Sequence, residues 1–316
     1  MHRHKNRFKN PHTREIRGWL DFLKWQLGLG PSEGPVRDGF LSPPQQVQPD
    51  FARIRNPDAA RVQVTWVGHS TFLLQAAGVN ILTDPIFSRR CSPVSFAGPQ
   101  RLTAPGLEFA ALPRIHAVLI SHNHYDHLDA RTVSRLGAAP VYFVPLGLAR
   151  WFAKRGIRDV VELDWWETST FADLQITCVP SQHFSGRSLF DRNRTLWSGW
   201  VVESTAGRIF FAGDTGYSPQ FKEIGEKLGP FRLALIPIGA YRPRWFMRPA
   251  HVDPREAVQI HRDVRAEFSV ASHWGTFPLT DEPVGEPPVL LAEALREAGI
   301  AADRFQALRP GETRVV

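Results

Sequence analysis

One short segment constrains the fold of this chain more than any other: residues 121–129 read Ser-His-Asn-His-Tyr-Asp-His-Leu-Asp. The segment holds three histidines and two aspartates in nine positions, and it follows an apolar run at residues 117–120 that predicts a buried strand. A tight turn after a strand can aim such side chains at two neighbouring points, and imidazole and carboxylate suit zinc, or less specifically iron or manganese. A polar loop of solvated histidines is the alternative, which this density of ligand types argues against. The candidate metal ligands here are His122, His124, Asp126 and His127.

The rest of the chain from residue 61 alternates short apolar runs with amphipathic stretches. We expect strands at residues 62–67, 80–83, 117–120, 141–144, 175–179, 200–203, 208–212, 233–237 and 268–271. Helical patterns lie at about 130–136, 148–155, 218–228, 254–264 and 288–298. Strands interleaved with helices predict α/β layers. The length of 316 residues, with 43% hydrophobic residues, allows one large domain with an extension or two small domains.

Three further ligand-type residues follow other expected strands. His183, Asp214 and His273 each stand within four residues of the end of an expected strand, where α/β folds place their sites. Each alone is more often a cap or a core polar group. Because all three share this placement in a chain that carries residues 121–129, they indicate a metal site assembled from several strand ends.

His69 and Asp84 have the same placement, after the expected strands at residues 62–67 and 80–83. Metal-bound histidines usually donate their second ring N–H to a carboxylate or a carbonyl. We therefore expect Asp84 and Asp129 to accept hydrogen bonds behind the metal ligands. His69 is expected to orient the first turn, and we do not assign it to metal.

Residues 1–60 are rich in arginine, lysine, proline and glutamine, and we treat them as an N-terminal extension to a domain at 61–316. Residues 14–29 carry apolar side chains at near-helical spacing and end in glycine and proline, which predicts one helix. This helix either packs on the domain surface or lies in a membrane interface. No run of about 18 apolar residues predicts a transmembrane helix. The basic N-terminus lacks the apolar core of a secretory signal peptide.

The net charge bears on the class of binding partner, and the cysteine content bears on the kind of metal site and the cellular compartment. The formal net charge of +7 suits an anionic partner such as nucleic acid, anionic lipid or a phosphorylated substrate, and simple solubility explains it equally well. Two cysteines, Cys91 and Cys178, exclude a disulfide scaffold and a cysteine-rich zinc site. We expect a cytoplasmic protein.

The order of the candidate ligands resembles the metal signature of the metallo-β-lactamase superfamily. The resemblance implies a four-layer αββα sandwich that binds two Zn²⁺ per chain. It implies that one ion is bound by His122, His124 and His183, that the other is bound by Asp126, His127 and His273, and that both are bridged by Asp214.

Longer runs resemble one branch of that superfamily, the N-acyl-phosphatidylethanolamine-hydrolysing phospholipases D. The likeness extends from about residue 64 to the C-terminus, with weaker echoes at residues 7–11. The runs specific to the branch include 162–167 and 236–247, whereas the metal motif specifies only the superfamily. The full set of similar runs is 82–87, 119–129, 143–148, 162–167, 180–183, 210–217, 236–241, 243–247, 251–254 and 273–277.

The branch implies a zinc-dependent phosphodiester hydrolase that converts N-acyl-phosphatidylethanolamine to N-acylethanolamine and phosphatidic acid. Zinc can lower the pKa of bound water to about 7, so we expect a metal-bridging hydroxide near Asp126 and Asp214 to attack phosphorus without a serine or cysteine nucleophile. His251 is expected to assist the leaving alkoxide, the alternative being a capping or core histidine. Ala250 stands where the family has a glutamine, a departure that can change rate or substrate preference.

A stretch at residues 241–248 mixes arginines with large apolar side chains, which suits the boundary of a lipid headgroup. A buried aromatic loop with solvated arginines is the alternative. Arginines 187, 192 and 194 form a second basic loop, to which we assign only an undirected electrostatic contribution. The expected substrate-binding residues are Tyr125, Tyr241, Arg244, Trp245, Phe246 and Met247.

Two other functions remain open on the sequence alone. A lactonase or a nuclease would keep the fold and the metals, since fold does not fix function. We find no RNA-binding module and no aromatic-basic platform beyond residues 241–248, so we expect no nucleic-acid partner. A non-enzymatic metal-dependent lipid-binding or scaffold protein is disfavoured, because seven ligands without thiolates are untypical of structural zinc. We expect a phospholipid substrate, peripheral membrane association and, from the resemblance, a homodimer.

Overall fold

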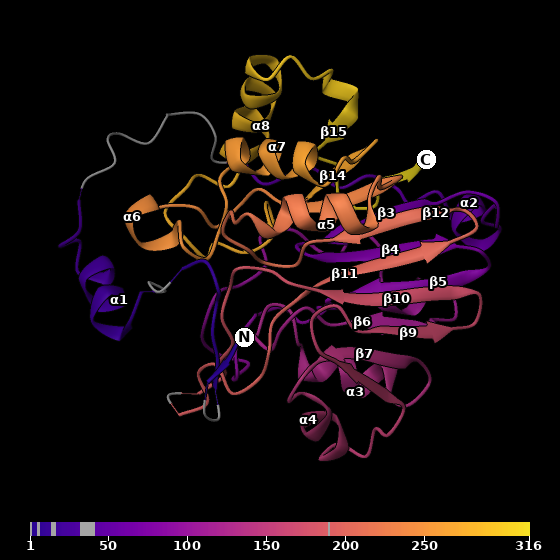
Figure 1. Ribbon diagram of the computed structural model, residues 1–316, viewed down its shortest axis with the longest axis horizontal. Helices are drawn as coiled ribbons and strands as arrows, with labels where there is room; N and C mark the ends of the chain where they lie inside the picture. The colour runs from indigo at the N-terminus through magenta and orange to yellow at the C-terminus, as the bar shows by residue number, and fades with distance from the viewer. Residues whose placement is uncertain (1, 5–6, 14–16, 32–41, 189) are drawn as a thin grey trace.

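The structure is a computed structural model that describes residues 2–4, 7–13, 17–31, 42–188 and 190–316. Within these residues, two seven-stranded sheets lie face to face and helices cover their outer faces (Figure 1). The expected four-layer α/β sandwich is thereby confirmed. No helix in the described part of the chain is both long and apolar enough to cross a bilayer.

The first sheet has the strand order β16-β3-β4-β5-β6-β7-β8. Pairing is antiparallel from β16 to β5 and parallel from β5 to β8. Both faces of β3 to β6 are covered, so these strands are almost continuously buried rather than alternating. The strands are β3 (Gln63–Gly68), β4 (Thr71–Ala76), β5 (Val79–Thr83), β6 (Ala117–Leu119), β7 (Val141–Pro145), β8 (Val160–Leu163) and β16 (Thr313–Val315).

The second sheet has the strand order β15-β14-β13-β12-β11-β10-β9. Pairing is antiparallel from β9 to β12 and parallel from β12 to β15. The ends of β10, β12 and β14 lead directly into site residues. The strands are β9 (Thr168–Phe171), β10 (Leu174–Val179), β11 (Gly199–Ser204), β12 (Gly207–Phe211), β13 (Leu233–Pro237), β14 (Ser269–Ser272) and β15 (Phe305–Gln306).

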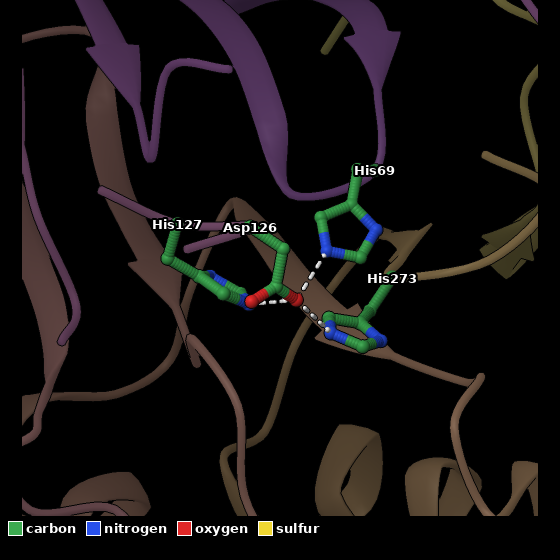
Figure 2. A group of neighbouring side chains, drawn as sticks. All are labelled: His69, Asp126, His127 and His273. Carbon is green, nitrogen blue, oxygen red and sulfur yellow. Dashed lines mark hydrogen bonds and ion pairs between the residues drawn. The ribbon is translucent and has the colours of Figure 1, made fainter. Parts of the chain in front are cut away.

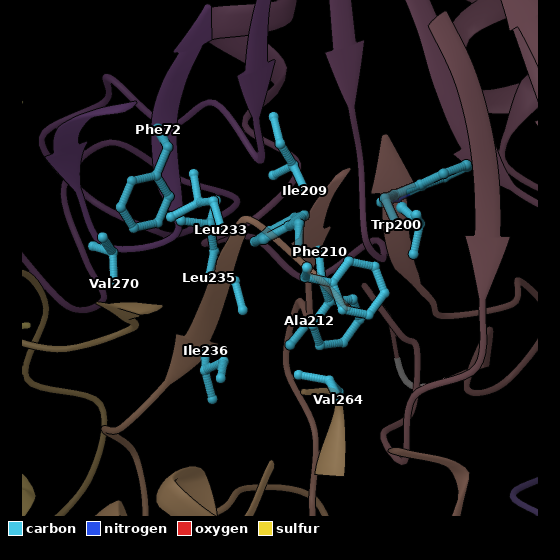
Figure 3. Packing of buried hydrophobic residues seen from close by; sticks show 14 of the residues in the cluster. Phe72, Trp200, Ile209, Phe210, Ala212, Leu233, Leu235, Ile236, Val264 and Val270 are labelled. Carbon is cyan, nitrogen blue, oxygen red and sulfur yellow. The ribbon is translucent and has the colours of Figure 1, made fainter. Parts of the chain in front are cut away.

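The main hydrophobic core lies between the two sheets and continues beneath the helices of the second sheet (Figure 3). Phe72 of the first sheet and Trp200 and Phe210 of the second are completely buried in it. The Trp200 indole N–H donates to the Ile120 carbonyl at 2.9 Å, which ties β11 to the end of β6. The two sheets are therefore locked together directly beside residues 121–129.

Helices form the outer layers. The first sheet is covered by α2 (Phe51–Arg55), α3 (Ala130–Leu136) and α4 (Ala149–Ala153), whose side chains contribute to a second core with Leu73 and Val118. The second sheet is covered by α5 (Gln220–Leu228), α7 (Pro254–Asp263) and α8 (Glu286–Glu297). The start of α7 is fixed by a capping box in which Asp253 accepts from the Glu256 amide at 2.9 Å. Shorter elements are α1 (Trp19–Gln26), α6 (Arg244–Met247), η1 (Phe109–Ala111), η2 (Ala302–Arg304), β1 (Arg3–His4) and β2 (Arg7–Phe8).

The expected elements match within about two residues, apart from several that the sequence pattern did not indicate. β4 was hidden because tight turns join it to both neighbouring strands. The other strands and α-helices that were not expected are short: β1, β2, β8, β9, β15, β16, α2 and α6. The N-terminal helix expected at residues 14–29 is found only over Trp19–Gln26 (α1), so residues 17–18 and 27–29 are not helical and the prediction was too long at both ends. Residues 14–16 lie outside the described residues.

Two described segments of residues 1–60, at residues 7–8 and 51–55, pack on the domain. Phe8 is 5% exposed and Ile54 is 1% exposed, and each belongs to a core cluster. The Phe8 amide donates to the Asn193 carbonyl at 2.8 Å. The N-terminal segment therefore contributes to the folded domain directly.

Candidate active site

The candidate ligands meet at one edge of the sandwich, where strands of both sheets end. His69, Asp84 and His273 each follow directly on a strand, and each has a positive backbone φ (55°, 34° and 59°). Positive φ at non-glycine residues is strained and clusters at functional sites. Asp214 follows Gly213 (φ 62°), where an added Cβ would lie 2.7 Å from the Ser121 Cβ. The chain turns sharply at these strand ends and brings the side chains together.

One group of ring nitrogens is formed by His122, His124 and His183. The His122 Nε2 and His124 Nδ1 atoms are 2.8 Å apart, and the His183 Nε2 and His124 Nδ1 atoms are 3.2 Å apart. All ligand atoms of this group lie within 4.8 Å of one another. Two strand ends, those of β6 and β10, therefore supply a three-nitrogen cluster.

A second group surrounds the Asp126 carboxylate, as Figure 2 shows. Asp126 Oδ2 lies 2.9 Å from His69 Nε2, 3.2 Å from His127 Nε2 and 3.4 Å from His273 Nε2. The three rings come from three different strand ends and all point toward this carboxylate (Figure 2).

Asp214 lies between the two groups. Its Oδ2 atom is 3.1 Å from both His127 Nε2 and His273 Nε2. The same atom is 3.9 Å from His122 Nε2 and 3.8 Å from His183 Nε2. The structure thus brings together all seven residues that the sequence indicated as metal ligands.

The chemistry of this donor set fits metal ions. Burial lowers the pKa of His124 to about 3 and that of His183 to about 4, so both rings are neutral near pH 7. Burial alone would raise the pKa of Asp214, but His127 and His273 outweigh it and hold that pKa well below its ordinary value. Asp214 and Asp126 outweigh burial at the other two rings: they raise the pKa of His273 to about 9 and that of His127 well above its ordinary value. Because metal binds neutral imidazole and ionised carboxylate, His127 and His273 would each release a proton when a metal binds. The buried Asp214 Oδ1 atom has no hydrogen-bond partner among the described residues.

Behind the ligands, Asp84 has the contacts that we expected of it. This fully buried carboxylate accepts from His127 Nδ1 at 2.6 Å and from the Ser121 amide and hydroxyl at 2.7 and 2.5 Å. Asp129 differs from our expectation, because it accepts from Thr132 Oγ1 at 2.5 Å and caps α3 instead of contacting a histidine. Its position at the start of a helix explains that contact.

Two hydrogen bonds at His183 were not foreseen as such. Its Nδ1 atom lies 2.9 Å from the Ala250 carbonyl oxygen. Position 250, where alanine replaces the glutamine of the family, therefore orients a ligand ring through its backbone. The Asn10 side chain donates to the His183 carbonyl at 2.8 Å and accepts from the Trp197 indole at 3.1 Å. Asn10 belongs to the weak family echo at residues 7–11, which was the signal available for it.

Arg187 has a specific structural contact that sequence reasoning missed. Its Nη1 atom donates to the carbonyls of Asn123 and Leu128 at 2.8 and 2.7 Å, and its guanidinium lies 3.9 Å from the ring centre of Tyr125. The Tyr125 hydroxyl donates to the Arg187 carbonyl at 2.9 Å. Arg187 therefore holds the loop that carries the ligands.

His251, expected to act on the leaving group, lies beside the ligands. Its ring centre is 5.0 Å from that of His183 and 5.4 Å from that of His273. With His183 and Asp214 it forms a further group whose ligand atoms lie within 4.8 Å of one another. Its buried Nδ1 atom has no hydrogen-bond partner within the described structure.

A cavity of about 740 Å³ opens from these groups toward the N-terminal helix. Asp126, Asp214, His251 and His273 belong to its lining, together with apolar side chains. The apolar lining residues include Trp19, Phe22, Trp25, Phe184, Phe246 and Met247.

The expected substrate-binding residues divide into three sets. Tyr125, Phe246 and Met247 line this cavity, whereas Tyr241 and Arg244 line a separate cavity of about 320 Å³. The Tyr241 hydroxyl donates to the buried Glu286 at 2.7 Å, and Arg244 pairs with Glu256 at 2.7 Å. Trp245 does not line the catalytic cavity. Successive side chains on a helical turn such as α6 point in different directions, so residues that are neighbours in the sequence face different cavities.

Comparisons with known proteins agree with this geometry. Residues 79–274 match the family model described as a beta-lactamase superfamily domain. The chain is 47% identical over 245 residues to N-acyl-phosphatidylethanolamine-hydrolyzing phospholipase D 1 of Caenorhabditis elegans. The aligned region covers 73% of this chain and 69% of that protein. It is 37% identical over 258 residues to the mitochondrial protein of that name from Saccharomyces cerevisiae, covering 79% of this chain and 55% of the yeast protein.

A solved structure shows the same fold. Igni18, a metallo hydrolase from Ignicoccus hospitalis, superposes with a TM-score of 0.62 at 24% identity and covers 81% of this chain and 98% of that chain. The fold, the converging His and Asp side chains and the two sequence relatives lead to one assignment. The chain belongs to the metallo-β-lactamase superfamily, in the group of the N-acyl-phosphatidylethanolamine-hydrolysing phospholipases D, and is a metal-dependent hydrolase.

Proposed function

We propose that this protein is a phospholipase D that hydrolyses N-acyl-phosphatidylethanolamine to N-acylethanolamine and phosphatidic acid with two Zn²⁺ ions. The observation that carries the proposal is the catalytic cavity, whose lining combines the His and Asp groups with apolar side chains. A phospholipid has the same combination, with a charged phosphodiester joined to acyl chains. The relatives from C. elegans and yeast carry the name of this activity.

In this proposal, one zinc ion would be held by His122, His124 and His183 and the other by Asp126, His127 and His273, and the Asp214 carboxylate would serve as a ligand as well. Bound zinc would activate water and stabilise charge on the phosphoryl oxygens. Asp84 fixes the His127 ring through its Nδ1 atom, and the Ala250 carbonyl fixes the His183 ring in the same way.

Two other groups of the chain act on the substrate itself. His251 lines the cavity and serves as a hydrogen-bond donor to the leaving alkoxide oxygen. Phe246 and Met247 also line the cavity and contact an acyl chain.

The test is hydrolysis of N-acyl-phosphatidylethanolamine in mixed micelles, with zinc content measured on every preparation. Asp214→Asn should abolish release of N-acylethanolamine, whereas Asp173→Asn, a matched change at an exposed position, should retain it. If zinc-loaded wild type releases no N-acylethanolamine, the substrate assignment fails, and lactones and nucleic acids become the substrates to screen.

We also propose that α1 contacts the membrane that supplies the substrate. Trp19, Leu20 and Leu27 are 59%, 74% and 69% exposed, and Trp19 lines the mouth of the cavity. Apolar side chains at such a rim gain free energy by entering the lipid interface.

Point substitutions test this better than removal of the N-terminus, because a truncation would also remove Phe8 from the core and Asn10 from its hydrogen bond to the His183 carbonyl. Trp19→Ser with Leu20→Ser should reduce co-sedimentation with phosphatidylcholine vesicles several-fold. Leu102→Ser, an exposed leucine that does not line the cavity, should leave it unchanged. Equal binding of all three proteins would eliminate the role of α1.

A further inference from the structure

A second cavity, of about 330 Å³, lies next to the catalytic cavity and is lined by five arginines. Tyr125 and Arg187 line both cavities and so form the wall between them. Arg89, Arg131 and Arg155 are exposed, and Arg90 and Arg187 are half-buried. Serine side chains at positions 88, 92 and 95 complete the polar lining.

The charge of this arginine-lined cavity is only partly balanced by the protein. Among the described residues, none of the five guanidinium groups forms an ion pair with a carboxylate. Asp129 is the acidic residue in the lining, and it already accepts from the Ser88 amide, the Arg131 amide and Thr132 Oγ1. The cavity therefore concentrates positive charge beside the catalytic cavity.

The cavity that Tyr241 lines offers a contrast within the same chain. It also holds three arginines, but each of them pairs with a glutamate: Arg242 with Glu286 at 3.0 Å, Arg244 with Glu256 at 2.7 Å, and Arg255 with Glu297 at 2.8 Å. Those arginines serve the protein's own structure. The five arginines of the 330 Å³ cavity have no such carboxylate partners in the described residues and repel one another unless an anion enters.

The protein uses part of this arginine set to shape the wall. Arg187 donates to backbone carbonyls of the ligand loop, and Arg155 donates to the Trp151 carbonyl at 3.0 Å and lies 3.6 Å from that ring centre. These contacts fix two guanidinium groups without neutralising them. An anion that binds here meets positive charge that is already in place, which reduces the entropic cost of binding.

We infer that this cavity is a phosphate-binding site separate from the catalytic centre. Guanidinium groups bind phosphate through paired N–H donors, and a phosphomonoester carries a charge of about −1.5 to −2 near pH 7, which matches several cations better than a carboxylate does. The phosphate belongs to a soluble ion or to a lipid headgroup. Val94 in the lining and Phe96 in the same loop are exposed, which is compatible with a lipid. The inference does not depend on the hydrolysed substrate.

Equilibrium dialysis of the zinc-loaded full chain against radiolabelled inorganic phosphate tests the site. Arg89→Gln with Arg131→Gln should bind one phosphate fewer per chain than wild type at a concentration that saturates wild type, with unchanged Tm and zinc content. The matched control is Arg232→Gln with Arg255→Gln, which removes the same charge from two exposed arginines elsewhere. Any phosphate bound at the zinc ions is common to all three proteins and cancels in the comparison.

Flotation with phosphatidylcholine vesicles, with and without phosphatidic acid, distinguishes the source of the phosphate. If phosphatidic acid-dependent flotation falls tenfold or more in the Arg89/Arg131 variant and not in the control variant, the phosphate belongs to a lipid headgroup. Loss in dialysis with unchanged flotation identifies a soluble phosphate. If neither measurement changes, or if the control variant loses as much, the inference is overturned.

Discussion

Replacement of Asp84 by asparagine isolates the role of a buried carboxylate that touches no substrate. The wild-type carboxylate receives three donors: the Ser121 amide and hydroxyl, and His127 Nδ1. An asparagine of the same shape has one oxygen and one NH₂ group, so at least one of these donors then faces another donor. A buried polar group that loses its partner costs about 1–3 kcal/mol.

The same change acts on the metal through His127. A carboxylate that accepts from Nδ1 keeps the proton on that nitrogen and leaves Nε2 free toward Asp126 and Asp214. Loss of such a partner typically weakens metal binding about 10- to 100-fold. At about 1.4 kcal/mol per factor of ten, this corresponds to roughly 1.4–2.8 kcal/mol of binding free energy.

The assay is competition for zinc between the protein and a fluorescent chelator at fixed pH, with urea unfolding of the same samples. Asp129→Asn is the matched control, because Asp129 caps α3 and contacts no ligand histidine, and asparagine caps a helix about as well as aspartate. It should retain wild-type zinc affinity. The reasoning is refuted if Asp84→Asn binds zinc as tightly as wild type, or if Asp129→Asn weakens binding to the same extent.

Three further predictions concern stability and are measured by urea unfolding. Burial lowers the pKa of His261 to about 4 in the folded protein, against 6.5 for the free side chain. The unfolded chain therefore binds more protons than the folded chain below pH 6.5, and roughly 3 kcal/mol of stability should be lost as the pH falls from 6.5 to 4. His261→Gln should make the free energy of unfolding depend less on pH in this range. Gly213→Ala, at φ 62°, places a Cβ 2.7 Å from the Ser121 Cβ and should lower the free energy of unfolding by about 2–4 kcal/mol. The control Gly78→Ala, at φ 75°, meets nothing within 4 Å and should lower it by about 1 kcal/mol. Equal losses of stability in the two variants would refute the steric argument. Arg187→Lys should destabilise by about 1–3 kcal/mol through lost donors to two backbone carbonyls, and Arg194→Lys at an exposed position should change stability by less than about 0.5 kcal/mol.

Sequence reasoning reached most of the fold because the relevant signals are local. Apolar runs predicted the strands that enter the site, and residues 121–129 were placed correctly at the end of β6. β4 was missed, since its apolar run adjoins those of both neighbours with only short turns between them. In a sandwich whose strands are covered on both faces, alternation is lost and cannot mark such boundaries.

Partners across the fold could not be derived in the same way. Asp84 and Asp129 have similar positions after strands, yet Asp84 meets His127 and Asp129 caps a helix. The Ala250 carbonyl orients His183, and no side-chain pattern reports a backbone acceptor. Tyr241 and Arg244 follow the composition of a lipid-binding stretch but pair with glutamates on α8 and α7.

The amino-acid order alone revealed the ligand-type residues and their positions at strand ends, which was sufficient to predict an α/β fold and a set of metal ligands. The arrangement of these ligands around Asp214, the carboxylate that supports them, and the largely apolar cavity that extends from them to α1 became known from the folded structure. The physical reason is that ligand chemistry and strand formation depend on neighbours along the chain. The aim of a side chain in the site depends instead on how two sheets, built from distant segments, pack against each other.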